Sequence, residues 1–168
     1  RRLSSMGMSS QLRNVGSLTA ALMAGGYQPM IDARHPHQQA AAERLGARIG
    51  ARPGADVVIE ATGSDTGVAR CCELVRPAGR IVLVGVFHGM VPLPALVALQ
   101  KEIVLAGSTT YGRHQGRRET EEAASLLASE PEIAATLITH RYPLAEARQA
   151  FAVAGDRSSG SIKVVIEP

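Results

Sequence analysis

The sequence predicts an α/β protein built on a doubly wound parallel sheet. Two short apolar runs rich in β-branched residues carry this prediction, at residues 56–60 (DVVIE) and 80–84 (RIVLV). One stretch of helix length separates them and ends in a turn at residues 76–79 (RPAG). The two runs therefore form a β-α-β unit whose strands are parallel and buried.

Helices and strands are expected to alternate on both sides of this unit. Glycines end the helical patterns at Gly25 and Gly46. The predicted order is a helix at 15–24, a strand at 28–33, a helix at 37–45, the two strands above, a helical turn at 96–100, a strand at 102–108 and a helix at 119–129. Leu126 and Leu127 are expected to point inward from the last of these helices because of their helical spacing.

The sequence changes character near its C-terminal end. A helix predicted over residues 144–154 lies between predicted strands at 138–142 and 162–166. We therefore expect two parts, a sheet domain over residues 1–138 and a C-terminal strand-helix-strand segment over residues 139–168.

Composition excludes several classes of partner. The chain has 168 residues, the length of one ordinary domain, and its net charge of +3 comes from arginines interleaved with Asp and Glu. Aromatic residues make up 3% and Trp is absent, so neither a basic nucleic-acid face nor a base-stacking surface is expected. No apolar run reaches the about 18 residues that cross a bilayer, and no signal peptide is recognisable. We expect a cytoplasmic protein with no nucleic-acid or membrane partner.

Small residues follow the two central strands. Thr62 and Gly63 follow the first strand, and Gly85 and Val86 follow the second. In open α/β sheets, ligands bind outside the carboxyl ends of the strands, and these ends meet at one edge. Glycine lets the backbone approach a ligand closely. The sequence therefore predicts a binding rim that contains these four residues.

Five short segments follow one another along the chain, namely DVVIEATG, RPAGRIVLVG, KEIVLAGS, YPLAEARQAF and GSIKVVI. In order and spacing they resemble the C-terminal half of zinc-dependent medium-chain dehydrogenases, the alcohol and threonine dehydrogenase-like family. The resemblance covers residues 15–168 and implies a Rossmann-like domain that binds NAD or NADP. It also implies that the segment from about residue 139 returns to a catalytic domain. That domain and its zinc site would lie N-terminal to this chain, so no catalytic residue and no metal ligand is assigned within it.

The resemblance also implies which residues touch the dinucleotide. These are Gly16, Asp32, Ala33, Arg34, Thr62, Gly63, Gly85, Val86, Ser108 and Thr109.

The turn that would hold the pyrophosphate departs from the expected pattern. Such turns read Gly-x-Gly-x-x-Gly, which brings backbone N–H groups to the phosphates. Residues 11–16 read QLRNVG and keep only Gly16, while Gln11 and Arg13 would crowd the turn. The serine-rich residues 4–10 are expected to form a poor central strand, because buried hydroxyls need partners. Residues 1–14 are therefore expected to be degenerate and dinucleotide binding to be weak.

The choice between NAD and NADP depends on the end of the second strand. Asp32 would accept hydrogen bonds from the ribose and repel a 2′-phosphate, whereas Arg34 would pair with that phosphate. The family register places Ala33 rather than Asp32 at the acidic position. The sequence therefore favours NADP slightly and leaves NAD open.

Histidines and cysteines do not form a recognisable metal motif. His35 and His37 make a His-x-His pair, but zinc requires three or four ligands, so they are expected to be loop residues at the adenosine end. His88 is expected to be a solvated loop residue. Cys71 and Cys72 are adjacent on a predicted helix, cannot bridge each other readily and are expected to be reduced.

Three functions remain open from the sequence. The first is the cofactor-binding domain of an NAD(P)-dependent oxidoreductase that acts on an alcohol, an aldehyde or a related substrate. The second is a non-catalytic Rossmann-fold assembly or interaction module, which the altered phosphate turn favours. The third is a methyltransferase-like domain, which fits the sheet but not the C-terminal segments.

A homodimer is expected through the edge strand that runs from Glu102 to Thr109. In the family that this chain resembles, the corresponding strand lies at the sheet edge and pairs with its twofold mate. Here the segment is apolar and carries no charge between Glu102 and Arg113. An exposed edge of this kind is satisfied by a partner strand.

Overall fold

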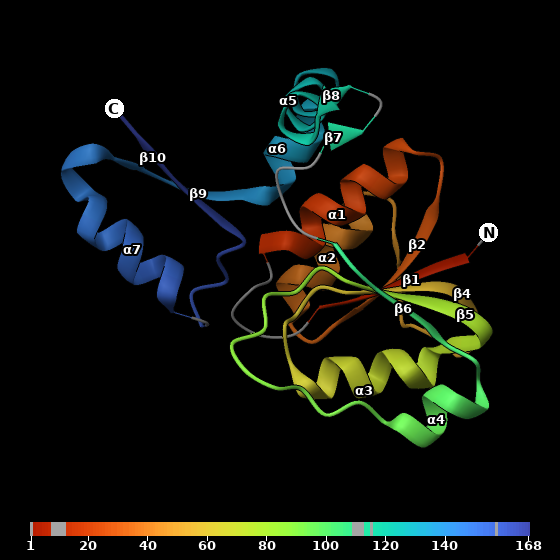
Figure 1. Cartoon of the computed structure of the whole chain (residues 1–168). Coiled ribbons are helices and arrows are strands. Elements are labelled where there is room, and N and C mark those ends of the chain that lie inside the picture. The colour runs from red at the N-terminus through yellow and green to blue at the C-terminus, as the bar shows by residue number, and fades with distance from the viewer. Residues whose placement is uncertain (1, 8–12, 109–112, 115, 157) are drawn as a thin grey trace.

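A parallel sheet flanked by helices forms the main body of the protein (Figure 1). The computed structural model describes residues 2–7, 13–108, 113–114, 116–156 and 158–168, with the backbone alone described for residues 2–7, 13–18, 114 and 117. Within these residues, six parallel strands follow the order β3-β2-β1-β4-β5-β6. Their bounds are β1 Arg2–Gly7, β2 Gln28–Ala33, β3 Arg48–Ile49, β4 Ala55–Glu60, β5 Val75–Leu83 and β6 Val104–Gly107. The predicted Rossmann-like α/β class is confirmed.

Helices cover both faces of the sheet. The helices α1 (Arg13–Ala24) and α2 (Pro36–Arg44) lie on one face, and α3 (Asp65–Leu74) and α4 (Ala95–Gln100) lie on the other (Figure 1). Helix α6 (Pro131–Leu137) packs against α1 and α2. These positions follow from right-handed crossovers between parallel strands.

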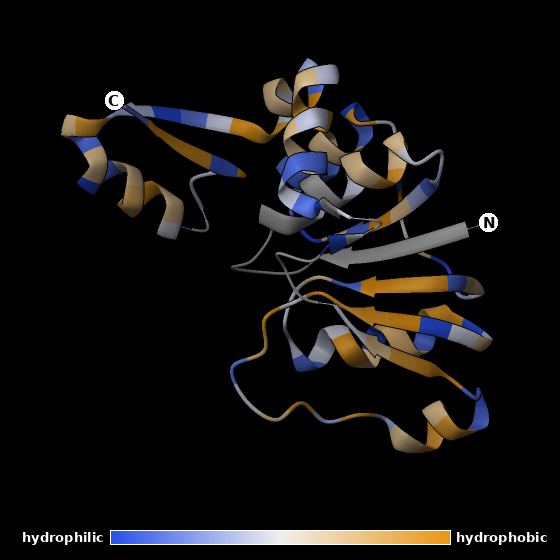
Figure 2. Ribbon diagram, turned by 45° about the horizontal axis from the view of Figure 1, so that its top comes forward, coloured by the Kyte–Doolittle hydropathy of each residue, from blue (hydrophilic) through white to orange (hydrophobic). Residues whose placement is uncertain are grey.

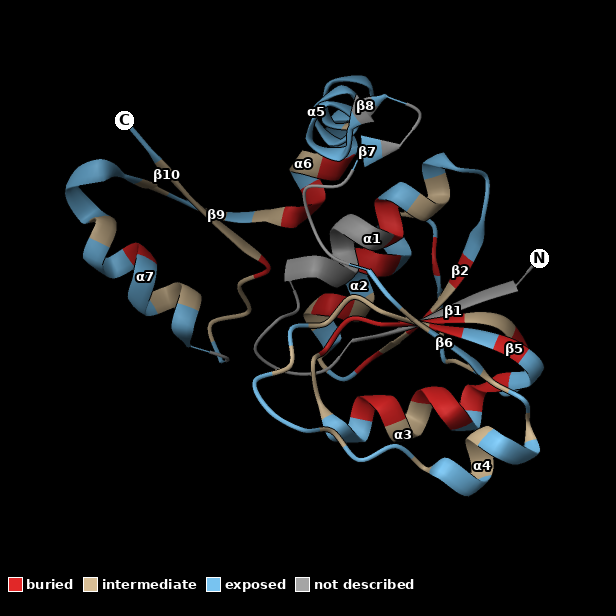
Figure 3. Ribbon diagram, viewed as in Figure 1, coloured by how far each residue is buried: buried red, intermediate tan, exposed pale blue. Residues whose placement is uncertain are grey.

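The core lies between β4, β5 and α3. Ala55, Val58 and Ile81 of the sheet meet Cys71 and Leu74 of α3, and all are buried. Figure 2 shows hydrophobic residues along β4 and β5, and Figure 3 shows buried residues in α3 and in parts of both strands. The β-branched runs that predicted these strands are thus the residues that fill the core.

The first strand corrects one expectation from the sequence. Residues 2–7, which include part of the serine-rich segment, form β1 in the centre of the sheet between β2 and β4. The backbone pairs on both sides, Leu3 with Pro29 and with Val57, and this ladder does not depend on apolar side chains. Residues 8–12, which contain Gln11, lie outside the described residues.

Other boundaries also differ from those predicted. Strand β5 begins at Val75, directly after α3, and its pairing with β4 shifts register between Ala55 and Val57. Strand β6 begins at Val104, because Glu102 has a positive φ of 51° in the turn before it. Leu127 is 48% exposed, so its predicted inward position is wrong.

Several short elements had no clear sequence signal. They are β3, α6 and the antiparallel pair β7 (Arg113–His114) and β8 (Arg117–Arg118), which precedes α5 (Glu119–Ser129). Helix α6 starts at Pro131, one residue after α5; the sequence prediction ended its helix at residue 129 and assigned none to residues 131–137.

The C-terminal residues form a separate small layer (Figure 1). Strands β9 (Ile138–Pro143) and β10 (Lys163–Glu167) pair in parallel as a second sheet. Between them lie a 3-10 turn (Leu144–Glu146) and α7 (Ala147–Gly155), which packs on β10. This is the predicted strand-helix-strand order. Leu144 (65%) and Phe151 (73%) leave apolar surface exposed on it.

Among the described residues, no helix combines the length and the apolar character needed to cross a membrane.

Candidate functional site

The loops after β4 and β5 interlock at the carboxyl edge of the sheet. Gly63 has a φ of +66°, and a Cβ placed on it would overlap the carbonyl group of Val86. A Cβ on Gly85 would overlap the backbone nitrogen of Gly63. Two loops can approach this closely only because both positions lack a side chain. The structure thus brings together the four residues that the sequence predicted for the rim.

The buried carboxylate of Glu60 accepts hydrogen bonds from the backbone of this rim. Glu60 ends β4 and has no exposed surface. Its side chain accepts a hydrogen bond from the backbone N–H of Thr62 at 2.7 Å and from that of Gly63 at 3.1 Å, and the hydroxyl of Thr62 also donates to it. The backbone carbonyl of Glu60 accepts the N–H groups of Val84 and Gly85. One residue therefore fixes both loops, and its buried carboxylate is satisfied by donors.

A chain of hydroxyl groups links the rim to helix α3. The hydroxyls of Thr62 and Ser64 lie 2.7 Å apart, and Thr62 is buried. Ser64 is the N-cap of α3, where its hydroxyl accepts the N–H of Gly67 at 3.1 Å. This is the capping interaction that starts a helix. The loop geometry is therefore set by α3 as well as by the sheet.

The other predicted residues that the structure describes lie towards the same edge. Met6 of β1 pairs with both Asp32 and Glu60, which places these two acidic residues at one level of the sheet. Ser108 follows β6, is exposed and donates its N–H to the carbonyl of Leu83 at 2.9 Å. Gly16 lies in the first turn of α1, the next described element after β1 along the chain. Thr109 lies outside the described residues.

The end of β2 presents side chains in two directions. Ala33 is buried in the cluster formed with Ala42 and Ala61, on the α2 face of the sheet. Asp32 points to the opposite face, where its Oδ2 lies 3.4 Å from Nε of Arg70 in α3. Arg34 is exposed. The three neighbouring residues thus have different environments.

Two histidines stack beside this strand end. The ring centroids of His35 and His37 are 5.6 Å apart, and burial together with the nearby His35 lowers the pKa of His37. His88 is exposed in the loop after β5. Among the described residues, no group of three or more His, Cys, Asp and Glu side chains is placed to hold a metal ion.

The cysteines lie beneath the rim in α3. Both are buried, and burial raises the pKa of each thiol; the nearby Glu60 adds to this effect at Cys71. Such thiols stay protonated and are poor nucleophiles.

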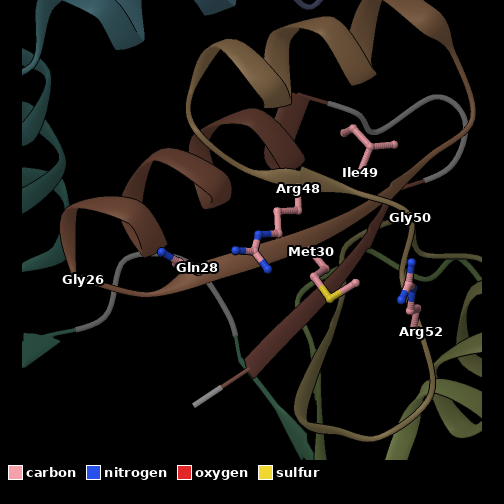
Figure 4. A pocket seen from close by; sticks show the side chains of 7 residues that line it. All are labelled: Gly26, Gln28, Met30, Arg48, Ile49, Gly50 and Arg52. Atoms are coloured by element: carbon pink, nitrogen blue, oxygen red, sulfur yellow. The ribbon is translucent and has the colours of Figure 1, made fainter.

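A cavity of about 520 Å³ lies away from the rim, on the face of β2 and β3 opposite α2. Figure 4 shows Arg48 and Gln28 on one side of it, Met30 in the middle and Arg52 on the other side. The connection from β3 to β4 spans only residues 50–54 and adds no helix to cover this face.

Family comparisons agree with this architecture. Residues 15–129 match the family described as zinc-binding dehydrogenase. The chain belongs to this family. Human (Homo sapiens) sorbitol dehydrogenase is 32% identical over 113 residues, an alignment that covers 67% of this chain and 30% of that enzyme. This zinc-binding dehydrogenase chain therefore matches about a third of the length of its curated relative.

Solved structures show the same fold. L-idonate 5-dehydrogenase from Escherichia coli superposes with a TM-score of 0.81 and 23% identity over 99% of this chain and 50% of its own. S. aureus TarJ, solved in complex with NADPH, gives a TM-score of 0.75 and 18% identity over 99% of this chain and 55% of its own. The zinc-binding dehydrogenase chain thus has the fold of about half of each of these proteins.

Sequence reasoning missed three residues that shape the site. Glu60 and Ser64 organise the rim, and Arg70 pairs with Asp32; none of the three belongs to a glycine pattern. A charged residue at the end of an otherwise buried strand, and a serine followed by a helix, are signals that point to the first two. Arg70 has no local signal, because its partner Asp32 lies 38 residues away in the sequence.

Proposed function

We propose that this chain is the dinucleotide-binding part of a zinc-type, NAD(P)-dependent oxidoreductase that acts on an alcohol or a polyol. The observation that carries the proposal is the interlocked pair of Gly63 and Gly85 at the carboxyl edge of the sheet, where bare backbone faces the region that binds dinucleotides in such folds. The NADPH complex of TarJ and the sorbitol specificity named for the human relative support the classes of cofactor and substrate.

The residues at the rim fit an elongated dinucleotide. Thr62, Gly63, Gly85 and Val86 would contact it over the centre of the sheet, and Ser108 with Thr109 would contact it beyond β6. Val86 is 55% exposed and presents an apolar surface at this edge. Gly16, at the start of α1, would lie where a helix N-terminus faces the pyrophosphate. When bound, the nicotinamide would supply the hydride chemistry; the residues of this chain hold and orient it.

The end of β2 would contact the adenosine ribose. Asp32, Ala33 and Arg34 are the proposed residues there, and the exposed Arg34 favours NADP over NAD because an arginine pairs with a 2′-phosphate.

The described residues do not fit a catalytic zinc ion, since they offer no cluster of three metal-binding side chains. No catalytic step is therefore assigned to this chain. Polarisation of the substrate would depend on residues outside the part of each relative that this chain matches.

Calorimetric titration of NADPH and NADH into the chain tests the proposal. We expect binding that Val86→Asp weakens at least about tenfold, or about 1.4 kcal/mol, because a hydrated carboxylate would replace the apolar surface that Val86 presents to the dinucleotide. Leu99→Asp is the matched control, since Leu99 is 75% exposed on α4, which precedes the amino end of β6, whereas the rim lies at the carboxyl ends of the strands. The absence of heat from both cofactors with the unmodified chain would eliminate the proposal and favour an assembly module.

We also propose that the chain forms a homodimer through β6. This strand is at the edge of the six-stranded sheet, and Val104 (49%) and Leu105 (44%) on it are half exposed. A second copy of the strand would satisfy its outer backbone groups.

A further inference from the structure

Asp32 is held by a residue from a distant helix. Nε of Arg70, in the middle of α3, lies 3.4 Å from Oδ2 of Asp32, and the two side chains are 38% and 34% exposed. The Nη1 group of Arg70 donates to Oε2 of Glu73 at 2.7 Å. Arg70 therefore bridges two carboxylates, one from its own helix and one from the end of β2.

This pair lies next to the rim. Asp32 is at the level of Glu60 in the sheet, because both pair with Met6, and Glu60 binds the Gly63 loop. The strand end itself is fixed, since the side chain of Gln39 donates to the carbonyl of Ala33 at 2.8 Å. Arg70 therefore faces the Asp32 carboxylate at a strand end whose backbone is itself hydrogen-bonded.

Arg34 has a different environment two residues later. It is exposed, and the described part of the chain places no carboxylate within ion-pair distance of it. The strand end therefore presents a carboxylate that is paired with Arg70 and, beside it, a guanidinium with no carboxylate partner among the described residues.

We propose that Arg70 is a positioning residue that sets the preference for NADP over NAD by holding and neutralising the carboxylate of Asp32. This proposal rests on the proposed function. An unpaired carboxylate at this strand end would accept ribose hydroxyls and repel a 2′-phosphate, as in NAD-specific sites. When the carboxylate is paired with Arg70, that repulsion is reduced and Arg34 determines the local charge.

The charge on Arg70 persists at every working pH. The hydrogen bond from Arg70 to Glu73 is the main contribution that raises the pKa of its guanidinium. Because the pair is partly exposed, its effect on a neighbouring charge is expected to be about three- to tenfold in affinity.

Dissociation constants for NADPH and NADH, measured by calorimetry on the whole chain and its variants, test the proposal. We expect Arg70→Ala to reduce the ratio of NADPH to NADH affinity by about three- to tenfold. Glu73→Gln is the matched control. It removes the ion pair between Arg70 and Glu73, which Arg70→Ala also removes, but it leaves Arg70 paired with Asp32. This variant should keep the ratio of the wild-type chain. The double variant Arg70→Ala with Asp32→Asn should restore it, since no free carboxylate remains.

Each outcome decides between distinct explanations. An unchanged ratio of NADPH to NADH affinity in Arg70→Ala would overturn the proposal. A ratio that stays low in the double variant would also overturn it, because that result would mean that Arg70 contacts the 2′-phosphate directly. Equal losses of both cofactors would indicate a structural role and also overturn it. If neither cofactor binds the unmodified chain, the proposed function itself fails. Circular dichroism of each variant separates these results from unfolding.

Discussion

The ammonium group of Lys101 donates to the backbone carbonyl of Cys72 at 2.8 Å. The same Nζ donates to the carbonyls of Glu73 at 3.0 Å and Val75 at 2.9 Å, so one side chain satisfies three acceptors where α3 ends and β5 begins. The carbonyl of Lys101 also accepts the N–H of Ala78. The last carbonyls of a helix lack intrahelical partners, and a cation is favourable there. Lys101 therefore joins α4 to the base of the α3–β5 unit.

Lys101→Met should destabilise the protein by about 2–3 kcal/mol, because hydrogen bonds to a charged group are lost and partly buried acceptors stay unsatisfied. Urea unfolding followed by circular dichroism measures this change. Arg80→Met, at an exposed position of β5, is the control and should change stability by less than about 0.5 kcal/mol. An equal effect of the two substitutions would show that the three contacts contribute little.

Glu60→Gln should loosen the rim while keeping its shape. The amide would keep one acceptor oxygen for the N–H of Thr62, while its NH2 group would lie opposite the N–H of Gly63, which now also donates to Oε2. We expect a loss of about 1–3 kcal/mol in unfolding free energy. Faster amide exchange should be confined to residues 61–67 and 84–86. Glu43→Gln, an exposed site on α2, should show neither change.

Gly85→Ala should be among the most damaging single methyl additions in the chain. Its Cβ would overlap the nitrogen of Gly63, which is backbone and cannot rotate away. Overpacking of this kind costs about 1–3 kcal/mol and more where the backbone must shift. Gly89→Ala, in the same loop, meets no atom within 4 Å and should leave the melting temperature nearly unchanged. Similar melting temperatures for the two variants would refute the interlocked geometry.

The sequence predicted this rim because glycine at a strand end is a local signal, and it predicted β4 and β5 because β-branched runs fill a buried sheet. It did not predict β1, since the serine-rich segment looks unsuitable until backbone pairing on both sides is known. The pairing of Arg70 with Asp32 and the contacts of Lys101 join residues distant in the sequence, which no local pattern encodes.

The buried thiols should make stability fall in alkaline solution. Burial raises the folded-state pKa of Cys71 above its ordinary value of 9.0, so above about pH 9 the unfolded chain loses a proton that the folded chain keeps. The stabilisation is fully present below that pH and is lost as pH rises, by at most about 1.4 kcal/mol per pH unit for one thiol. Cys71→Ala should show a shallower decline between about pH 9 and 10.5 in urea unfolding. Parallel declines would show that this thiol ionises normally.

The proposed dimer can be tested at the exposed edge of β6. Leu105 is 44% exposed beside the outer backbone groups of the strand, and Leu105→Lys should prevent pairing because a charged edge cannot be buried against its copy. Sedimentation at tens of micromolar should show a dimer for the unmodified chain and a monomer for this variant. Leu127→Lys, at a similarly exposed leucine of α5, should remain dimeric. A monomeric unmodified chain would contradict the proposed dimer. A dimer that persists in Leu105→Lys would show that the interface lies elsewhere. The exposed Leu144 and Phe151 of the C-terminal layer would then be the next surface to test.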